Sequence, residues 1–300
     1  SDVSSLGAVN ILNLSDSNTI KDVSALGGVY SLRLSGCDEL VDVSALGGVH
    51  DLYLSGCHRV TDVSALTHVK CLHLTFMFGN GSVSDVSALQ NVIELDLTGC
   101  KEISDVSALG RVRSLSLCGC SRIVDVSALG DVHSLDLYNC TSVRDVSALG
   151  NICHLNLSNC SGISDVSALG GVCSLNLSNC TGVQDVSALG SVHNLNLTGC
   201  ELIEDVHALG GVHTLTISAG MGRWNRLTRI TDVSCLGNVH QLCLSGCPSI
   251  TDVSALGKVH DLDLSSCNGV TDVSALGNNY RLKLADCHGI TDVSTLGRVT

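Results

Sequence analysis

Apolar and polar residues alternate along this chain in a pattern that returns about every twenty residues. When the chain is aligned on Asp-Val-(Ser/His)-x-Leu, fifteen aspartates line up, and twelve of the fourteen intervals between them have the same length of twenty. The two longer units are 62–84 and 205–231, which add three and seven positions to that length. Such self-similarity is typical of a solenoid, whose units bury their apolar faces only by stacking on one another. No linker interrupts the series, so we predict a single domain over 1–300 with about fourteen full repeats.

The unit that begins at Asp22 shows how each repeat is expected to fold. Leu32 and Leu34 alternate with polar neighbours, which predicts a short strand with one buried face. The other apolar positions, which are also expected to point inward, are Val23, Leu26, Val29, Cys37 and Leu40. Only eight residues separate Leu40 from Val49, too few for a return helix, so we expect a single 3-10 turn or β-turn on the back. Glycine follows Leu26 or its equivalent in thirteen of fifteen units, which favours positive φ there.

These features resemble the leucine-rich repeat family over essentially the whole chain. The family's segment L-x-x-L-x-L-x-x-(N/C)-x-L is matched by Val29-x-x-Leu32-x-Leu34-x-x-Cys37-x-x-Leu40. The cysteine in that segment resembles the cysteine-containing subclass, and Asp-Val-Ser-Ala-Leu resembles the back segment of bacterial internalins. The resemblance implies an α/β-type repeat solenoid coiled to the right, with little or no α-helix. One parallel β-sheet would line its concave face, and 3-10 or β-turn segments its convex face.

The repeated aspartates dominate the charge of the chain. Its net charge is −13, and the fifteen aligned aspartates account for more than all of it, so the acidity belongs to the framework. An aspartate two residues before a serine is a capping pattern, since its carboxylate can accept backbone N–H groups of the next turn. We favour capping over a calcium ladder, because calcium needs several oxygen ligands that converge from different directions. The negative charge also excludes binding to a nucleic-acid backbone as the main function.

The seventeen cysteines indicate a reducing environment. Eleven of them fill the same inward position at the end of the strand, where they should act as small buried apolar groups with a weak S–H donor. So many buried thiols favour the cytoplasm or another reducing intracellular compartment. Disulfides between consecutive positions of this series in freshly purified protein would contradict that expectation. We find neither a signal peptide nor an apolar run of membrane-spanning length, so no membrane association is expected.

Histidines recur at the position just after the inward valine. In two successive units that position is Cys153 and Cys173, flanked by His133 and His193, which together form a zinc-type ligand set. Four rungs at the spacing of neighbouring strands cover about 14 Å, whereas zinc–ligand bonds are about 2.0–2.3 Å long. We therefore predict a row of partly exposed polar residues, with no metal and no cofactor.

Catalytic patterns are not evident. The sequence holds no phosphate-binding glycine loop, no Gly-x-Ser-x-Gly elbow and no His-Glu-x-x-His segment. Glu204, Asp205 and His207 place two carboxylates beside an imidazole, but His207 only replaces the usual serine of the cap. We predict that the protein is not an enzyme.

The two long units contain the residues that we expect to bind a partner. They hold the only Trp, both Phe and both Met, while the central outward positions of the middle strands are small and polar, as at Asn156, Asn176 and Asn196. Binding hot spots are enriched in Trp, Tyr and Arg. The predicted partner-binding residues are Trp224, Arg223, Arg226, Arg229, Phe76, Tyr53 and Tyr138.

The sequence therefore favours a non-enzymatic scaffold that binds a protein partner through the concave sheet and the two inserted loops. The alternative is a structural element that associates end to end, because neither end of the chain carries a polar capping motif. Sugar binding by the Asn/Ser rows and metal binding by the His/Cys rows are less favoured, and repeat duplication accounts for the similarity of those rows.

Overall fold

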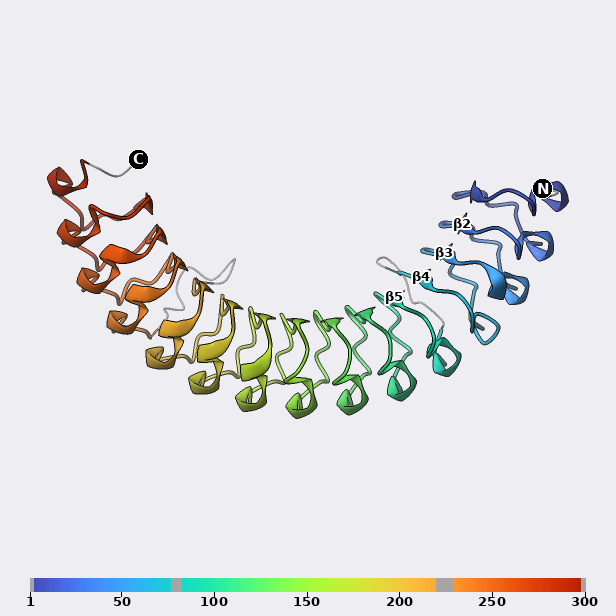
Figure 1. Cartoon of the computed structure of the whole chain (residues 1–300), viewed down its shortest axis with the longest axis horizontal. Coiled ribbons are helices and arrows are strands. Elements are labelled where there is room, and N and C mark those ends of the chain that lie inside the picture. The colour runs from blue at the N-terminus through green and yellow to red at the C-terminus, as the bar shows by residue number, and fades with distance from the viewer. Residues whose placement is uncertain (1–2, 77–82, 220–228, 298–300) are drawn as a thin grey trace. The chain divides into compact units, whose positions relative to one another are not determined.

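The computed structural model describes residues 3–76, 83–219 and 229–297, and they fall into two compact units, 1–148 and 149–300. Each unit is a stack of rungs, in which the short strands lie on one side and the 3-10 turns on the other (Figure 1). Between β3 and β4 the 3-10 turn is replaced by a plain turn at 64–68. The described residues contain no α-helix, as predicted. The prediction of a single domain stays a prediction.

Seven short strands form parallel pairs in sequence order in unit 1. They are β1 (Ile11–Asn13), β2 (Ser31–Arg33), β3 (Asp51–Tyr53), β4 (Cys71–His73), β5 (Glu94–Asp96), β6 (Ser114–Ser116) and β7 (Ser134–Asp136). The turns are η1 (Ser4–Leu6), η2 (Ser24–Leu26), η3 (Ser44–Gly48), η4 (Ser87–Leu89), η5 (Ser107–Leu109) and η6 (Ser127–Leu129). η7 (Ser147–Leu149) lies at the boundary between the units.

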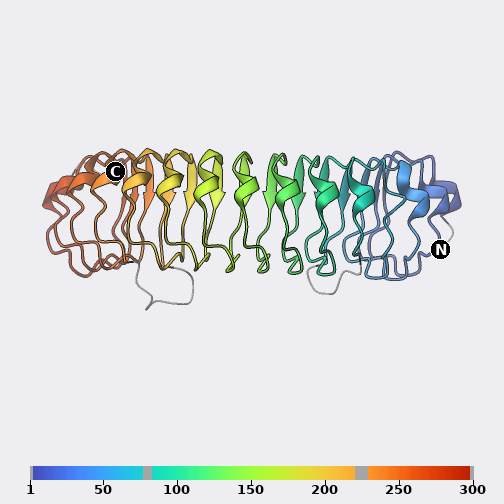
Figure 2. The same ribbon diagram turned by 90° about the horizontal axis from the view of Figure 1, so that it is seen from below.

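Unit 2 repeats the same arrangement. Its strands are β8 (His154–Asn156), β9 (Ser174–Asn176), β10 (Asn194–Asn196), β11 (Thr214–Thr216), β12 (Gln241–Cys243), β13 (Asp261–Asp263) and β14 (Arg281–Lys283). Its turns are η8 (Ser167–Gly171), η9 (Ser187–Ser191), η10 (His207–Gly211), η11 (Ser234–Asn238), η12 (Ser254–Lys258), η13 (Ser274–Leu276) and η14 (Ser294–Leu296). Seen from below, the turns of successive rungs lie side by side (Figure 2).

The core is built as the repeat predicts. In the rung that begins at Asp22, all seven expected positions are buried, with exposed fractions of 2% or less. The register places each central leucine of a strand opposite that of the next, as in Leu32↔Leu52 and Leu242↔Leu262. A single rung cannot bury its own leucine and valine side chains, because both of its faces are exposed to water. These side chains become buried only when neighbouring rungs stack on both faces.

The cysteine series is a ladder inside the core. Ten of its eleven members are buried, and Cys287 is half-buried. As expected of a weak donor, Cys57 Sγ donates to the carbonyl oxygen of Leu34 at 3.1 Å, and Cys180 Sγ donates to that of Leu157 at the same distance. These bonds link consecutive rungs and satisfy carbonyls at the ends of the strands. Burial raises the pKa of Cys57 to about 12, so this thiol is a poor nucleophile.

Where a glycine follows the inward leucine of a turn, as at Gly27, it is needed for a different reason from the predicted one. Gly27 has φ of −64° and lies in the right-handed helical region, so the expectation of positive φ was wrong. A Cβ atom at Gly27 would lie 2.3 Å from the carbonyl oxygen of Ala45 in the next rung. Glycine is therefore required by the close approach of neighbouring rungs. Positive φ occurs instead in the turn after the strand, for example at Gly36 (72°) and Asn139 (58°).

The repeated aspartates cap the turns, as predicted. In every described repeat the Oδ1 atom accepts the backbone N–H two residues further on, at 2.8–2.9 Å; the acceptors are Asp22, Asp42, Asp62, Asp85, Asp105, Asp125, Asp145, Asp165, Asp185, Asp205, Asp232, Asp252, Asp272 and Asp292. The hydrogen bonds from Ser127 lower the pKa of Asp125, and those from Ser107 lower the pKa of Asp105.

These lowered pKa values predict a loss of stability in acid. A carboxylate whose pKa is lower in the folded than in the unfolded state stabilises the fold above its unfolded pKa of about 3.9, and this contribution disappears as the pH falls through the folded pKa. We expect the urea midpoint to drop as the pH is lowered from about 5 to about 3. In the Asp105→Asn/Asp125→Asn variant, neutral amides can accept the same N–H groups, so the drop should be smaller. An equal drop in both proteins would show that the caps do not cause it.

Candidate functional site

The outward positions of the strands form columns across the sheet within each unit, and these columns are the candidate binding surface. In unit 1 the third strand positions follow one another as Arg33, Tyr53, His73 and Asp96. The Arg33 guanidinium lies 4.0 Å from the centre of the Tyr53 ring, and that ring stacks on His73 with centroids 4.6 Å apart. Tyr53 is half-buried in this column. The stacking holds the tyrosine in place and leaves part of its surface exposed to a partner.

A groove crosses the outward face of unit 2 between β11 and β14. It has a volume of about 370 Å³, and its polar lining comes from Thr214, Thr216, Gln241, Cys243, Asp261, Asp263, Arg281 and Lys283. Two acids on β13 face two cations on β14: Asp263 Oδ2 lies 3.4 Å from Lys283 Nζ, and Asp261 Oδ2 lies 3.8 Å from Arg281. Burial alone would raise the pKa of Asp263, but hydrogen bonds from Ser265 and the Lys283 charge outweigh it, so the pKa is lowered. The groove is therefore a charged surface of mixed sign.

Rings stack in a second column of unit 2, just before each strand. His193, His213, His240, His260 and Tyr280 follow one another with centroids 4.6–4.8 Å apart. These side chains are half-buried or exposed, which confirms the predicted row of partly exposed polar residues. Desolvation and the neighbouring His193 and His240 lower the pKa of His213, since adjacent imidazolium ions repel. The stacking of this row and its end at Tyr280 are not evident from the repeat pattern, because they depend on contacts between rungs.

The asparagine row of unit 2 has a framework role. The Oδ1 atoms of Asn156, Asn176 and Asn196 accept the backbone N–H two residues further on, at 3.0–3.1 Å. Asp263 makes the same bond to Ser265 at 3.0 Å. Each acceptor holds the turn that follows its strand, so the amide oxygens of the row are engaged by the chain itself. This use accounts for the recurring Asn without a sugar ligand.

The predicted partner-binding residues have different outcomes. Trp224, Arg223 and Arg226 lie outside the described residues. Arg229 is described, and its guanidinium pairs with Glu204 Oε1 at 2.7 Å. Tyr138 is 41% exposed.

The expectation that Phe76 contacts a partner was wrong. Its side chain is only 2% exposed, and its ring lies 5.5 Å from that of His58. In the long unit 62–84 this phenylalanine is part of the core, so its side chain offers no contact surface to a partner.

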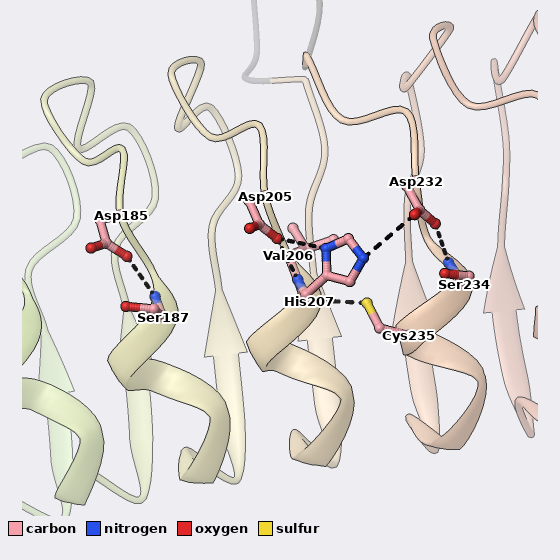
Figure 3. A network of polar contacts seen from close by, with 8 residues as sticks. All are labelled: Asp185, Ser187, Asp205, Val206, His207, Asp232, Ser234 and Cys235. Atoms are coloured by element: carbon pink, nitrogen blue, oxygen red, sulfur yellow. Dashed lines mark hydrogen bonds and ion pairs between the residues drawn. The ribbon is translucent and has the colours of Figure 1, made fainter.

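The acidic and imidazole groups at residues 204–207 do not form a catalytic arrangement. His207 lies between two capping aspartates of successive rungs, with Nδ1 2.8 Å from Asp205 Oδ1 and Nε2 3.5 Å from Asp232 Oδ2 (Figure 3). The hydrogen bond to Asp205 raises the pKa of His207. The nearby Cys235 thiol donates to the Val206 carbonyl oxygen at 3.3 Å, and desolvation raises its pKa. The imidazole thus bridges two caps and has no activated nucleophile in this network of described residues.

Comparisons with known proteins agree with the fold. An internalin from Listeria monocytogenes superposes with a TM-score of 0.57 at 19% identity, covering 98% of this chain and 86% of the internalin. The functional domain of InlJ from the same organism, which includes a cysteine ladder, gives 0.60 at 19% identity over 97% of this chain and 66% of its own. A leucine-rich-repeat protein of Leptospira interrogans gives 0.52 at 17% identity, with 93% and 91% covered. No family model and no curated protein matches the chain.

The fold is that of a leucine-rich-repeat solenoid with an internal cysteine ladder. Among the described residues, no helix is long and apolar enough to cross a membrane. The end-to-end association considered from the sequence stays a prediction.

Proposed function

We propose that this protein is a non-enzymatic scaffold that binds a protein partner through the outward face of its sheet and the longer of the two inserts. The observation that carries the proposal is the charged groove on β11–β14 together with the position of the longer insert. That insert follows β11, the strand that borders the groove, and Arg229 at its end is paired with Glu204. The groove supplies charge of both signs, and the insert supplies the only tryptophan of the chain with Arg223 and Arg226 beside it.

Trp224 is the proposed main contact of that surface. Interface hot spots are enriched in Trp and Arg, and the truncation of one typically costs about 2 kcal/mol or more. We expect Trp224→Ala to weaken partner binding by about 2 kcal/mol, or about 30-fold, without loss of the fold. The measurement is a quantitative pull-down from lysate of the source cells, followed by titration of the captured partner against both proteins.

Two deletions test whether the insert itself is the binding element. Removing residues 222–228 shortens the unit 205–231 to the common repeat length and keeps Arg229, so the rung should still stack while binding falls. The matched control removes residues 79–81 and shortens the unit 62–84 in the same way. If the longer deletion recovers the same partners at the same strength as the control, the proposal fails. It also fails if Trp224 is shielded from a collisional fluorescence quencher in the free protein.

A further inference from the structure

Three potential metal ligands of different kinds meet on the outward face of unit 1. His50 and Asp51 lie at the start of β3, and Cys71 begins β4, directly opposite Asp51 in the strand register. One ligand atom from each side chain lies within 4.8 Å of the other two, and all three residues are half-buried. The imidazole and carboxylate are already in contact, with 2.6 Å between His50 Nδ1 and Asp51 Oδ1.

Glu94 brings a second carboxylate to the same place. It begins β5 and is paired in register with Cys71. Burial raises the pKa of Cys71 to about 11, and the charges of Glu94 and Asp51 contribute to the increase. The thiol is therefore flanked by carboxylates from both neighbouring strands. A cation bound here would neutralise these carboxylates and stabilise the thiolate.

The chain contains a second copy of the His–Asp pair with a different neighbour. His260 Nδ1 lies 3.1 Å from Asp261 Oδ1 at the start of β13, as His50 lies beside Asp51. The position that corresponds to Cys71 is Arg281 on β14, whose guanidinium lies 3.8 Å from Asp261. In that copy a side-chain cation faces the carboxylate. In the β3–β4 copy a thiol takes its place, and a thiol can bind a metal ion where arginine cannot.

We propose that His50, Asp51 and Cys71, with Glu94 as the fourth ligand, bind a zinc ion on the outward face of unit 1. One nitrogen, one sulfur and two oxygen ligands suit zinc, whereas calcium and magnesium prefer oxygen alone. Zinc–ligand bonds of about 2.0–2.3 Å place tetrahedral ligands about 3.3–3.8 Å apart. The ligand atoms of His50, Asp51 and Cys71 now lie within 4.8 Å of one another, with the His50–Asp51 pair at 2.6 Å, so they need shifts of about 1 Å. Half-buried side chains reach this by rotation. Binding releases the Cys71 thiol proton to solvent. His50 binds through Nδ1 as the tautomer that carries its proton on Nε2, so the proton count of the imidazole does not change.

The test is a calorimetric titration of the reduced, metal-free full chain with Zn²⁺. We expect Cys71→Ser and His50→Ala each to weaken one binding event at least about tenfold, since even the loss of an outer-shell partner of a metal typically costs about 10–100-fold. Cys243→Ser and His260→Ala are the matched controls, because they remove a half-buried thiol and an imidazole from the same face of the sheet elsewhere. Zinc bound at other positions remains in every variant, so the difference reports on this site.

Cobalt gives an independent readout. With Co²⁺ in place of zinc, a thiolate-to-cobalt charge-transfer band should appear in the wild type and in Cys243→Ser, and should be weaker in Cys71→Ser by the contribution of this one site. Circular dichroism establishes that the variants are folded. The proposal is overturned if the wild type shows no thiolate band, if Cys71→Ser titrates like the wild type, or if the controls lose as much affinity as the ligand variants.

Discussion

The Leu135→Asp variant is expected to unfold its part of the array. Leu135 is the central residue of β7 and is 1% exposed. The substitution removes a buried leucine and places an unpaired carboxylate in a core of leucine, valine and cysteine side chains. Buried unpaired charge and a core truncation each cost several kcal/mol, so we expect the free energy of unfolding to fall by more than about 4 kcal/mol. The change is measured by urea denaturation, with far-ultraviolet circular dichroism as the signal.

The neighbouring residue on the same strand provides the control. Ser134 is half-buried at the first, outward position of β7, so Ser134→Asp leaves the carboxylate hydrated. Its urea midpoint should stay close to that of the wild type. A midpoint for Leu135→Asp that also stays close would mean that the rung can turn its strand outward, contrary to the register described above.

The second large effect is expected at the glycine of the turn. A Cβ atom at Gly110 would lie 2.2 Å from the carbonyl oxygen of Ala128 in the next rung, a distance at which backbone must move. Thr67 and Gln90 take this position in two rungs, so the backbone can adapt where the sequence provides for it. In a rung formed around glycine, we expect Gly110→Ala to cost about 2–3 kcal/mol of unfolding free energy, the upper part of the range for overpacking.

Gly119→Ala separates steric contact from backbone conformation. Gly119 has φ of 74°, and a Cβ atom there would meet no described residue within 4 Å apart from its own chain neighbours. The free energy of unfolding should therefore fall only by the cost of placing alanine in the left-handed backbone region, roughly 1–2 kcal/mol. We expect Gly110→Ala to be the more destabilising of the two when both are measured by urea denaturation. The reverse order would mean that the backbone at Gly110 accommodates a Cβ atom more easily than the 2.2 Å distance indicates.

Features that depend on short stretches of chain could be predicted from the sequence. The strand at Leu32–Leu34 follows from alternation, and the cap of Asp22 follows from a hydrogen bond that reaches only to the second residue after it. The inward position of Cys37 follows from its place in the repeat. The strand and the cap recur along the stack, and eleven units also carry the inward cysteine, because each rung must bury its apolar side chains and satisfy its backbone hydrogen bonds.

The candidate site was predicted less completely, because it depends on side chains from several rungs. Tyr53 was expected on the outward face, but its stacking on His73 was not. The grouping of Asp51 with Cys71 also escaped, although the two lie one repeat apart and the register places them side by side. Aligning the residues at the first position of successive strands would have predicted this grouping. Phe76 was expected on the surface, but its side chain is buried. The sequence does not show which residues of the unit 62–84 fill the core.

The sequence by itself therefore determined the repeat, the parallel strands, the capping aspartates and the buried cysteine ladder. Only the tertiary structure decided why the turn glycine is required, which rings stack, and which ligands meet on β3 and β4. The first set rests on periodicity and on hydrogen bonds between close neighbours in the chain. The second rests on distances between rungs, such as the 2.3 Å from the Cβ position of Gly27 to the Ala45 carbonyl oxygen, which exist only once the rungs are stacked.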